Sequence, residues 1–180
     1  YGSVFDPDPG HTEKVTSLSL SLFDQLQSIH MLGREERHLL ECSALLHDIG
    51  WSRGGGKHHV SSMQMILNDM ELPFGTRERY MVASVARYHN SLPKAKHYNY
   101  SILNQIDRRT VSMLSSILRI GDGLDASHGG KVNGIEVLIS EERVLLRADA
   151  SNPIPQEEEK FSIKKDLFEK VFKRSIVLSD

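Results

Sequence analysis

The sequence lacks several features that mark specialised classes of protein. Its 180 residues include a single cysteine, Cys42, so no disulfide can form within the chain, which agrees with a reducing compartment. No run approaches the ~20 apolar residues that a membrane-spanning helix needs, and no leading segment has the pattern of a signal peptide. We therefore expect a cytoplasmic protein that has no membrane partner. Because the chain begins at Tyr1 and not at methionine, we also expect residues upstream of it.

An excess of charge of either sign is also missing. The chain has 22 lysines and arginines against 24 aspartates and glutamates, a net charge of −2, and the two signs are interspersed. Domains that bind nucleic acid usually present a basic patch, so nucleic acid is not the partner that we expect. Apolar residues make up 39% of the chain, which is enough for the core of one domain of ordinary size.

Apolar residues at helical spacing dominate the first two thirds of the chain. Asp8 and Pro9 are the residue types of an N-cap and a first helical position, and an apolar stripe follows from His11. The alternation of serine and leucine over 17–22 is typical of a strand, but the longer stripe and the cap favour a helix, which Gly33 ends. Further helices are predicted over 35–49 with Gly50 as C-terminal cap, from 58 or 59 through 67, from 76 to 89, and over 107–124.

The pattern changes after residue 131. Two runs rich in β-branched residues, 135–139 and 144–147, flank a polar turn and predict a hairpin, whose edge offers a route to a homodimer. The rest is expected to be a polar linker, a short amphipathic helix and a strand, over 151–159, 167–172 and 176–178. We therefore predict a mainly α fold with a helical bundle over 1–131 and a small appendage of hairpin, helix and strand over 132–180.

Imidazole and carboxylate side chains stand at the ends of four apolar stripes. They are His11, the adjacent pair His47 and Asp48, His89 and Asp122. Each alone is more often a hydrogen-bonded histidine or a helix-end cap, but a bundle brings stripe ends together at one end of its core. Nitrogen and oxygen ligands without a usable cysteine suit Mn, Fe, Mg, Zn or Ni and do not choose among them. Hydrolysis is the chemistry that such a site favours, because the metal polarises a phosphoryl oxygen and activates water.

The order of these residues resembles a known superfamily. His11, then His47 and Asp48, then Asp122 follow the H…HD…D order of the HD-domain metal-dependent phosphohydrolases. Nearly the whole chain is similar, more closely, to the C-terminal HD-like half of the Ppx/GppA family of exopolyphosphatases and guanosine pentaphosphate phosphohydrolases. The segments that carry this closer similarity are 44–50, 87–93 and 118–125.

The resemblance implies an HD-domain helical bundle with one or two divalent metal ions. The first ion would be bound by His11, His47, Asp48 and Asp122. The second would be bound by His89 with His59 or its neighbour His58; His59 is preferred because it leads the apolar stripe. We expect His47 and Asp48 to be catalytic as well, with Asp48 orienting the attacking water, and Asp125 to support the ligands from behind.

Four basic residues are candidates for binding the oxygens of a phosphate group. They are Arg53, Lys57, Arg87 and Arg119. The alternative for Arg87 and Arg119 is a structural ion pair with Asp122 or Asp125. Trp51 and His128 are expected to be packing and surface residues.

The leading hypothesis is a metal-dependent phosphohydrolase whose substrate is a small phosphate-containing molecule, a nucleotide or polyphosphate. The resemblance also implies an alternative, because the phosphatase site of full-length Ppx/GppA proteins lies in N-terminal actin-like domains that this sequence does not match. The chain would then be a non-catalytic regulatory module that binds polyphosphate or guanosine polyphosphate nucleotides. A third hypothesis is a di-iron oxygenase, since some HD proteins use two irons.

Overall fold

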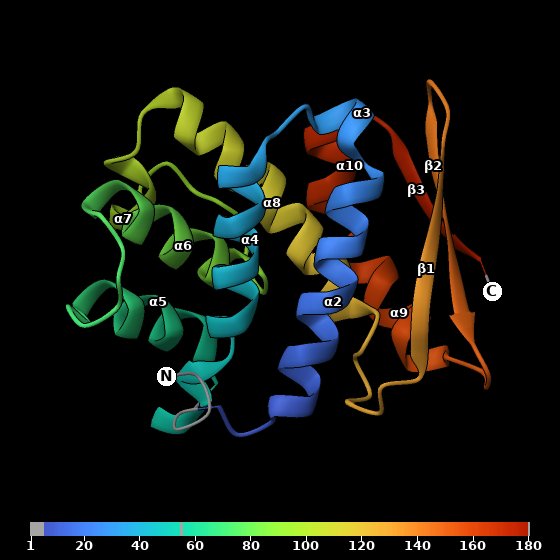
Figure 1. The fold of residues 1–180 in the computed structure, drawn as a ribbon, viewed down its shortest axis with the longest axis horizontal. Helices are drawn as coiled ribbons and strands as arrows, with labels where there is room; N and C mark the ends of the chain where they lie inside the picture. Colours follow the sequence, from blue (N-terminus) through green and yellow to red (C-terminus); the bar gives the residue numbers. More distant parts are fainter. Residues whose placement is uncertain (1–5, 55, 180) are drawn as a thin grey trace.

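Helices make up most of the computed structural model, which describes residues 6–54 and 56–179. The expectation based on Tyr1 therefore lies outside the described residues. The mainly α prediction is confirmed (Figure 1). The helices before the sheet are α2 (Pro9–Gln25), α3 (Gln27–His30), α4 (Arg34–Leu46), the 3₁₀ helix η1 (Ile49–Arg53), α5 (His58–Asn68), α6 (Thr76–Tyr88), α7 (Tyr98–Ser101) and α8 (Gln105–Gly123). The remaining elements are β1 (Val132–Ile139), β2 (Arg143–Ala150), α9 (Pro155–Lys164), α10 (Asp166–Phe172) and β3 (Ser175–Ser179).

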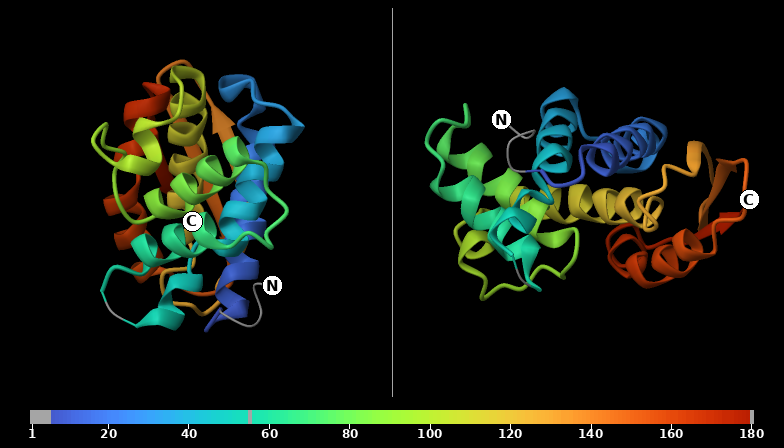
Figure 2. Two further views of the ribbon diagram at one scale, coloured as in Figure 1. Left: turned by 90° about the vertical axis from the view of Figure 1, so that its left-hand side faces the viewer. Right: turned by 90° about the horizontal axis from the view of Figure 1, so that it is seen from below.

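Helix α8 runs through the middle of the molecule. It packs against α2, α4 and α6 on the bundle side and against α9 and α10 on the other (Figure 2). Its side chains are buried nearly all round, Ser115 and Ser116 included, as expected of a helix enclosed by others. None of the helices in the described residues is long and apolar enough to cross a membrane.

The alternating serines of 17–22 belong to a helix, as predicted. Asp8 caps α2 by accepting a hydrogen bond from the backbone N–H of His11 at 3.1 Å. Ser19 is fully buried where α2 crosses α8, and a Cβ atom at Gly121 would overlap its Oγ atom. Small residues on both helices therefore let them approach closely, just beside Asp122.

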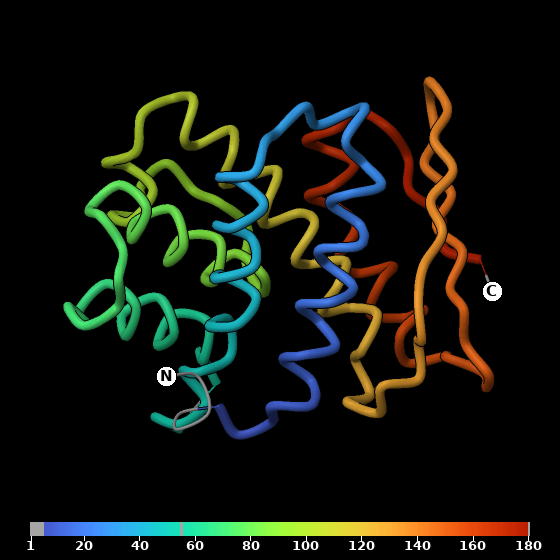
Figure 3. The backbone as a smooth tube through the Cα atoms, in the orientation of Figure 1, coloured from blue at the N-terminus to red at the C-terminus, as the bar shows by residue number. Residues whose placement is uncertain are grey.

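The end of α4 differs from the prediction. The helix ends at Leu46, and His47 and Asp48 form a turn before η1, so 35–49 is not one helix (Figure 3). Gly50 is not a left-handed C-terminal cap. It is needed because its backbone touches α5, where a Cβ atom would overlap the carbonyl oxygen of His58 and the amide nitrogen of Ser62.

The appendage contains one helix more than predicted. The described residues form a sheet of order β1-β2-β3, in which β1 and β2 are antiparallel and β3 is parallel to β2. Helix α9 begins inside the predicted linker over 151–159. Its hydrophobic pattern is weak because two of its buried residues, Glu157 and Lys164, are charged.

Candidate metal centre

Histidines and aspartates from five helices and turns meet at one end of the bundle. His11 lies in the first turn of α2, Asp122 in the last turn of α8, and His47 and Asp48 in the turn after α4. His11 is 3% exposed, His47 0% and Asp48 7%, so this polar group is enclosed by the core. The structure thus brings together the residues predicted to bind the first ion.

The first cluster consists of His11, His47, Asp48 and Asp122. The Nε2 atom of His11 lies 3.3 Å from Oδ1 of Asp122 and 3.9 Å from Oδ2 of Asp48. The Nε2 atom of His47 lies 3.6 Å from the same Asp48 oxygen. The ligand atoms of His11, His47 and Asp48 are within 4.8 Å of one another, a spacing at which one ion can contact all three.

Hydrogen bonds on the far side of each ring fix which nitrogen faces the cluster. The Nδ1–H group of His47 donates to the carbonyl of Ala44 at 2.7 Å, and Nδ1 of His11 lies 2.8 Å from Oδ2 of Asp125. A carbonyl only accepts, and an ionised carboxylate only accepts, so both rings carry the proton on Nδ1 and turn the Nε2 lone pair inward. The supporting role expected of Asp125 agrees with this contact.

Three buried atoms of this cluster have no hydrogen-bond partner among the described residues. They are Nε2 of His11, Nε2 of His47 and Oδ1 of Asp48. Buried polar atoms are almost always paired. The two Nε2 atoms face each other across the first cluster, where a cation would pair both, whereas Oδ1 of Asp48 faces His58 and His89. A divalent metal ion fits this donor set, because neutral imidazole and carboxylate are the forms that bind it.

A second cluster shares Asp48. Its Oδ1 atom lies 3.4 Å from Nε2 of His58 and 3.5 Å from Nε2 of His89. The Nδ1–H group of His89 donates to the carbonyl of Ala86 at 2.6 Å, so its Nε2 is an acceptor, and the Nε2–H group of His58 donates to it at 3.0 Å. Each oxygen of Asp48 therefore faces one cluster.

The preference for His59 over His58 was wrong. His58 begins α5 and is 8% exposed beside Asp48, whereas His59 is half-buried and its Nδ1 atom has no hydrogen-bond partner among the described residues. The buried stripe of α5 starts one residue earlier than predicted and contains His58, Ser62, Met63 and Ile66. Met70 is 79% exposed because the helix ends before it.

Burial keeps these imidazoles neutral. It lowers the pKa of His47 and of His58, lowers that of His89 well below its ordinary value, and lowers the pKa of His59 to about 4. A neutral imidazole is the form that binds a metal, so the surroundings favour the ligand state at physiological pH.

A lysine from the missed helix α9 reaches the site. The side chain of Lys164 is 4% exposed, and its ammonium group donates to Oδ2 of Asp122 and to the carbonyl of His89, the latter at 3.2 Å. Burial lowers the pKa of Lys164 to about 7; the charge of Arg119 acts in the same direction, and that of Asp48 opposes it. No pattern in the sequence pointed to this residue, because it is a single lysine in a charged segment.

A cavity of about 140 Å³ opens onto the two clusters. Besides Asp48, His58, His89 and Asp122, its walls include Trp51, Asn90, His128, Lys160 and Lys164. The ring of Trp51 stacks on His58 with 4.3 Å between centroids, and His128 stacks on His11 at 3.8 Å. As expected, Trp51 is a packing residue and His128 is a surface residue, and both also line the cavity beside the clusters.

The four basic residues predicted to bind phosphate are not among the cavity's lining residues in the described part of the chain. Arg119 is buried and pairs with Asp166 at 2.7 Å, which is a structural ion pair with a partner other than the two predicted. Arg87 donates to the side chain of Asn99 at 2.8 Å. Arg53, the last residue of η1, and Lys57, just before α5, are both exposed.

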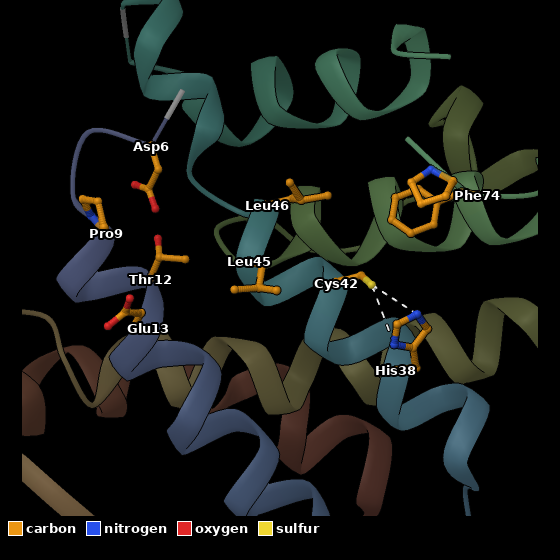
Figure 4. Close-up of a pocket in the computed structure, with 10 residues that line it drawn as sticks. Asp6, Pro9, Thr12, Glu13, His38, Cys42, Leu45, Leu46 and Phe74 are labelled. Atoms are coloured by element: carbon orange, nitrogen blue, oxygen red, sulfur yellow. Dashed lines mark hydrogen bonds between the residues drawn. The ribbon is translucent and has the colours of Figure 1, made fainter. Parts of the chain in front are cut away.

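A larger cavity, of about 540 Å³, lies elsewhere, between α2 and α4 (Figure 4). Its walls carry Leu45, Leu46 and Phe74, and the His38 and Cys42 side chains contact each other at its edge. Burial raises the pKa of the Cys42 thiol, so it is not an activated nucleophile. None of the residues of the two clusters lines this cavity.

Comparison with known proteins agrees with the resemblance seen in the sequence. A model of the family described as Ppx/GppA phosphatase, domain III, matches residues 2–152. The match includes both clusters and ends before α9, so Lys164 lies outside it. A comparison with curated proteins finds none that matches the chain. Since the family model covers most of its length, the chain belongs to the Ppx/GppA phosphatase domain III family.

Proposed function

We propose that this chain is a metal-dependent phosphohydrolase that removes a phosphoryl group from a nucleotide or polyphosphate. The observation that carries the proposal is the set of three unpaired buried acceptors, Nε2 of His11, Nε2 of His47 and Oδ1 of Asp48. A domain that had lost its metal would be expected to pair these atoms or replace them by apolar groups. Membership of a phosphatase family and the HD-like order of the residues support the proposed reaction class.

His11, His47, Asp48 and Asp122 would bind the metal. When bound, the metal acts as a Lewis acid that polarises a phosphoryl oxygen and lowers the pKa of water. Asp48 would accept a proton from the attacking water, because its Oδ1 atom has no hydrogen-bond partner among the described residues and its side chain belongs to a residue that lines the cavity.

The shape of the cavity favours a terminal phosphoryl group. The cavity measures about 140 Å³ and is partly open to solvent, so a phosphoryl group would enter it while the rest of a nucleotide lies outside. Lys160 and Trp51 are exposed at the cavity wall, where the leaving group would extend. An ammonium group and an aromatic ring there suit a further phosphate or a base.

Removing the proposed base or a ligand tests this function. Asp48→Asn is expected to lower phosphate release at least ~10²-fold, the usual contribution of general base catalysis. His47→Ala is expected to lose both metal and activity. Phosphate release from p-nitrophenyl phosphate, guanosine polyphosphate nucleotides and polyphosphate, with Mn²⁺ added, measures the effect, and elemental analysis of protein purified without chelator measures the metal.

His38→Ala is the matched control, because this exposed histidine lies on α4 outside both clusters and is expected to leave activity unchanged. Full activity in both Asp48→Asn and His47→Ala would refute the assignment of the site.

A regulatory binding module is the second candidate function. The observation that favours it is the contact of Lys164 with Asp122, because an ammonium group beside a ligand candidate competes for the carboxylate. This candidate predicts tight binding of polyphosphate or a guanosine polyphosphate nucleotide by calorimetry, with no phosphate release under any divalent metal. Turnover that depends on Asp48 would exclude it.

A further inference from the structure

Lys164 places a positive charge beside a group of carboxylates at the two clusters. The carboxylates of Asp48, Asp122 and Asp125 are gathered at the clusters, and Asp125 is 1% exposed. With Lys164 protonated, their three negative charges are balanced by one divalent cation together with one ammonium group. A second divalent cation would leave an enclosed site with two excess positive charges, which is unfavourable in a medium of low dielectric constant.

The ammonium group also occupies one carboxylate oxygen at the clusters. Asp122 turns Oδ1 toward His11 and the first cluster, whereas its Oδ2 accepts from Lys164. Lys164 is further held by the carbonyl of His89, so it is fixed between the last turn of α8 and the residue that follows α6. Its side chain is 4% exposed, which leaves it little room to move away.

The second cluster is the poorer of the two. It offers His58, His89 and Asp48, and its two rings already satisfy each other through their hydrogen bond at 3.0 Å. The first cluster offers four ligands, and both of its imidazole Nε2 atoms lack a hydrogen-bond partner among the described residues.

We propose that Lys164 replaces a second metal ion, so that this protein binds a single divalent ion in the cluster of His11, His47, Asp48 and Asp122. This inference rests on the proposed function only in requiring that the first ion binds. The lysine comes from α9, outside the part of the chain that matches the family, so the C-terminal helix sets the number of ions in the site. A single-ion site would also exclude the di-iron oxygenase hypothesis.

Counting bound ions tests the proposal. The full chain is equilibrated with Mn²⁺, passed through gel filtration and analysed by elemental mass spectrometry, with calorimetry as a second count. We expect one Mn²⁺ per chain in the wild type and two in Lys164→Met, which removes the charge at similar volume. The two ions in the variant should also give the exchange-coupled paramagnetic resonance signal of a manganese pair.

Lys160→Met is the matched control, because Lys160 lies on the same cavity wall but is exposed and has no contact with a ligand candidate in the described residues. It is expected to keep one ion; a second ion in it would show that cavity charge in general, and not Lys164, sets the count. Circular dichroism establishes that each variant is folded.

Two ions in the wild type would overturn the inference, whether or not Lys164→Met folds, and leave the proposed function standing. One ion in a folded Lys164→Met variant would overturn it too. No ion in any of the proteins would instead refute the metal-dependent function, so the two failures are distinct. His58→Gln is expected to retain one ion; its loss would show that the ion lies in the second cluster.

Discussion

Asp125 illustrates how a residue outside the first cluster shapes the ligands within it. Its Oδ2 atom accepts from Nδ1 of His11 at 2.8 Å, and its Oδ1 atom accepts from the backbone N–H of Gly130 at 2.8 Å. The second bond fixes the carboxylate, and the first fixes the tautomer of the histidine. A carboxylate behind a ligating imidazole raises the basicity of the ring and orients it.

Asp125→Asn is therefore expected to weaken metal binding 10–100-fold, the usual effect of losing such support, without unfolding the protein. The amide keeps one acceptor for Gly130 but no longer stabilises the ligand form of His11. Titration calorimetry with Mn²⁺ measures the change in Kd. Asp149→Asn, an exposed aspartate on β2, should leave the Kd unchanged, and an unaltered Kd in Asp125→Asn would show that the bond to His11 is structural only.

At the residue scale, the sequence identified the ligand candidates that stand at the end of a strong apolar stripe. His11 and Asp122 were found in this way, and the structure places them 3.3 Å apart. The choice between His58 and His59 failed because adjacent residues differ by only 100° around a helix whose first residue was uncertain. The burial of Lys164 could not be predicted from the sequence, since one buried lysine among exposed charges leaves no periodic signal.

At the scale of elements, close crossings position the site. Gly50 holds η1 against α5 and so places His58 beside Asp48, and its amide donates to the hydroxyl of Ser62 at 2.9 Å. A glycine after a helical stripe is usually a C-terminal cap, which is why the sequence alone suggested that role. Glycine is needed at this position because it contacts α5, which lies further along the chain. Hydrophobic periodicity does not report such contacts.

Gly50→Ala is expected to destabilise the protein by about 1–3 kcal/mol, because the added methyl group meets backbone atoms of α5 that cannot rotate away. Urea denaturation measures the change in the free energy of unfolding. Gly134→Ala in β1 is the control, since a Cβ atom there meets no described atom within 4 Å. Equal stability of Gly50→Ala and the wild type would mean that η1 is not packed as closely as described.

At the scale of the whole molecule, the appendage is joined to the bundle by a shared core. Phe161 and Phe168 are 2% and 0% exposed, and buried residues from Val15 to Ile176 form one hydrophobic cluster. The division into 1–131 and 132–180 stays a prediction, based on a change of sequence pattern. The buried contacts argue that the two parts unfold together, because removing the appendage would expose the face of α8 that α9 and α10 cover.

Phe168→Ala tests whether the whole chain unfolds as one unit. Loss of a buried phenylalanine is expected to lower the free energy of unfolding by about 3–5 kcal/mol. Trp51, the only tryptophan, lies in η1 at the candidate metal centre, so its fluorescence reports on the bundle, whereas circular dichroism reports on all helices. In one cooperative unit both transitions shift to the same lower urea concentration, and Ile163→Ala, at a residue 61% exposed on α9, shifts neither. If the urea midpoint of the Trp51 fluorescence transition does not change while the dichroism transition splits in two, residues 132–180 form a separate domain. The position of Lys164 at the metal centre would then depend on docking of that domain and not on the common core.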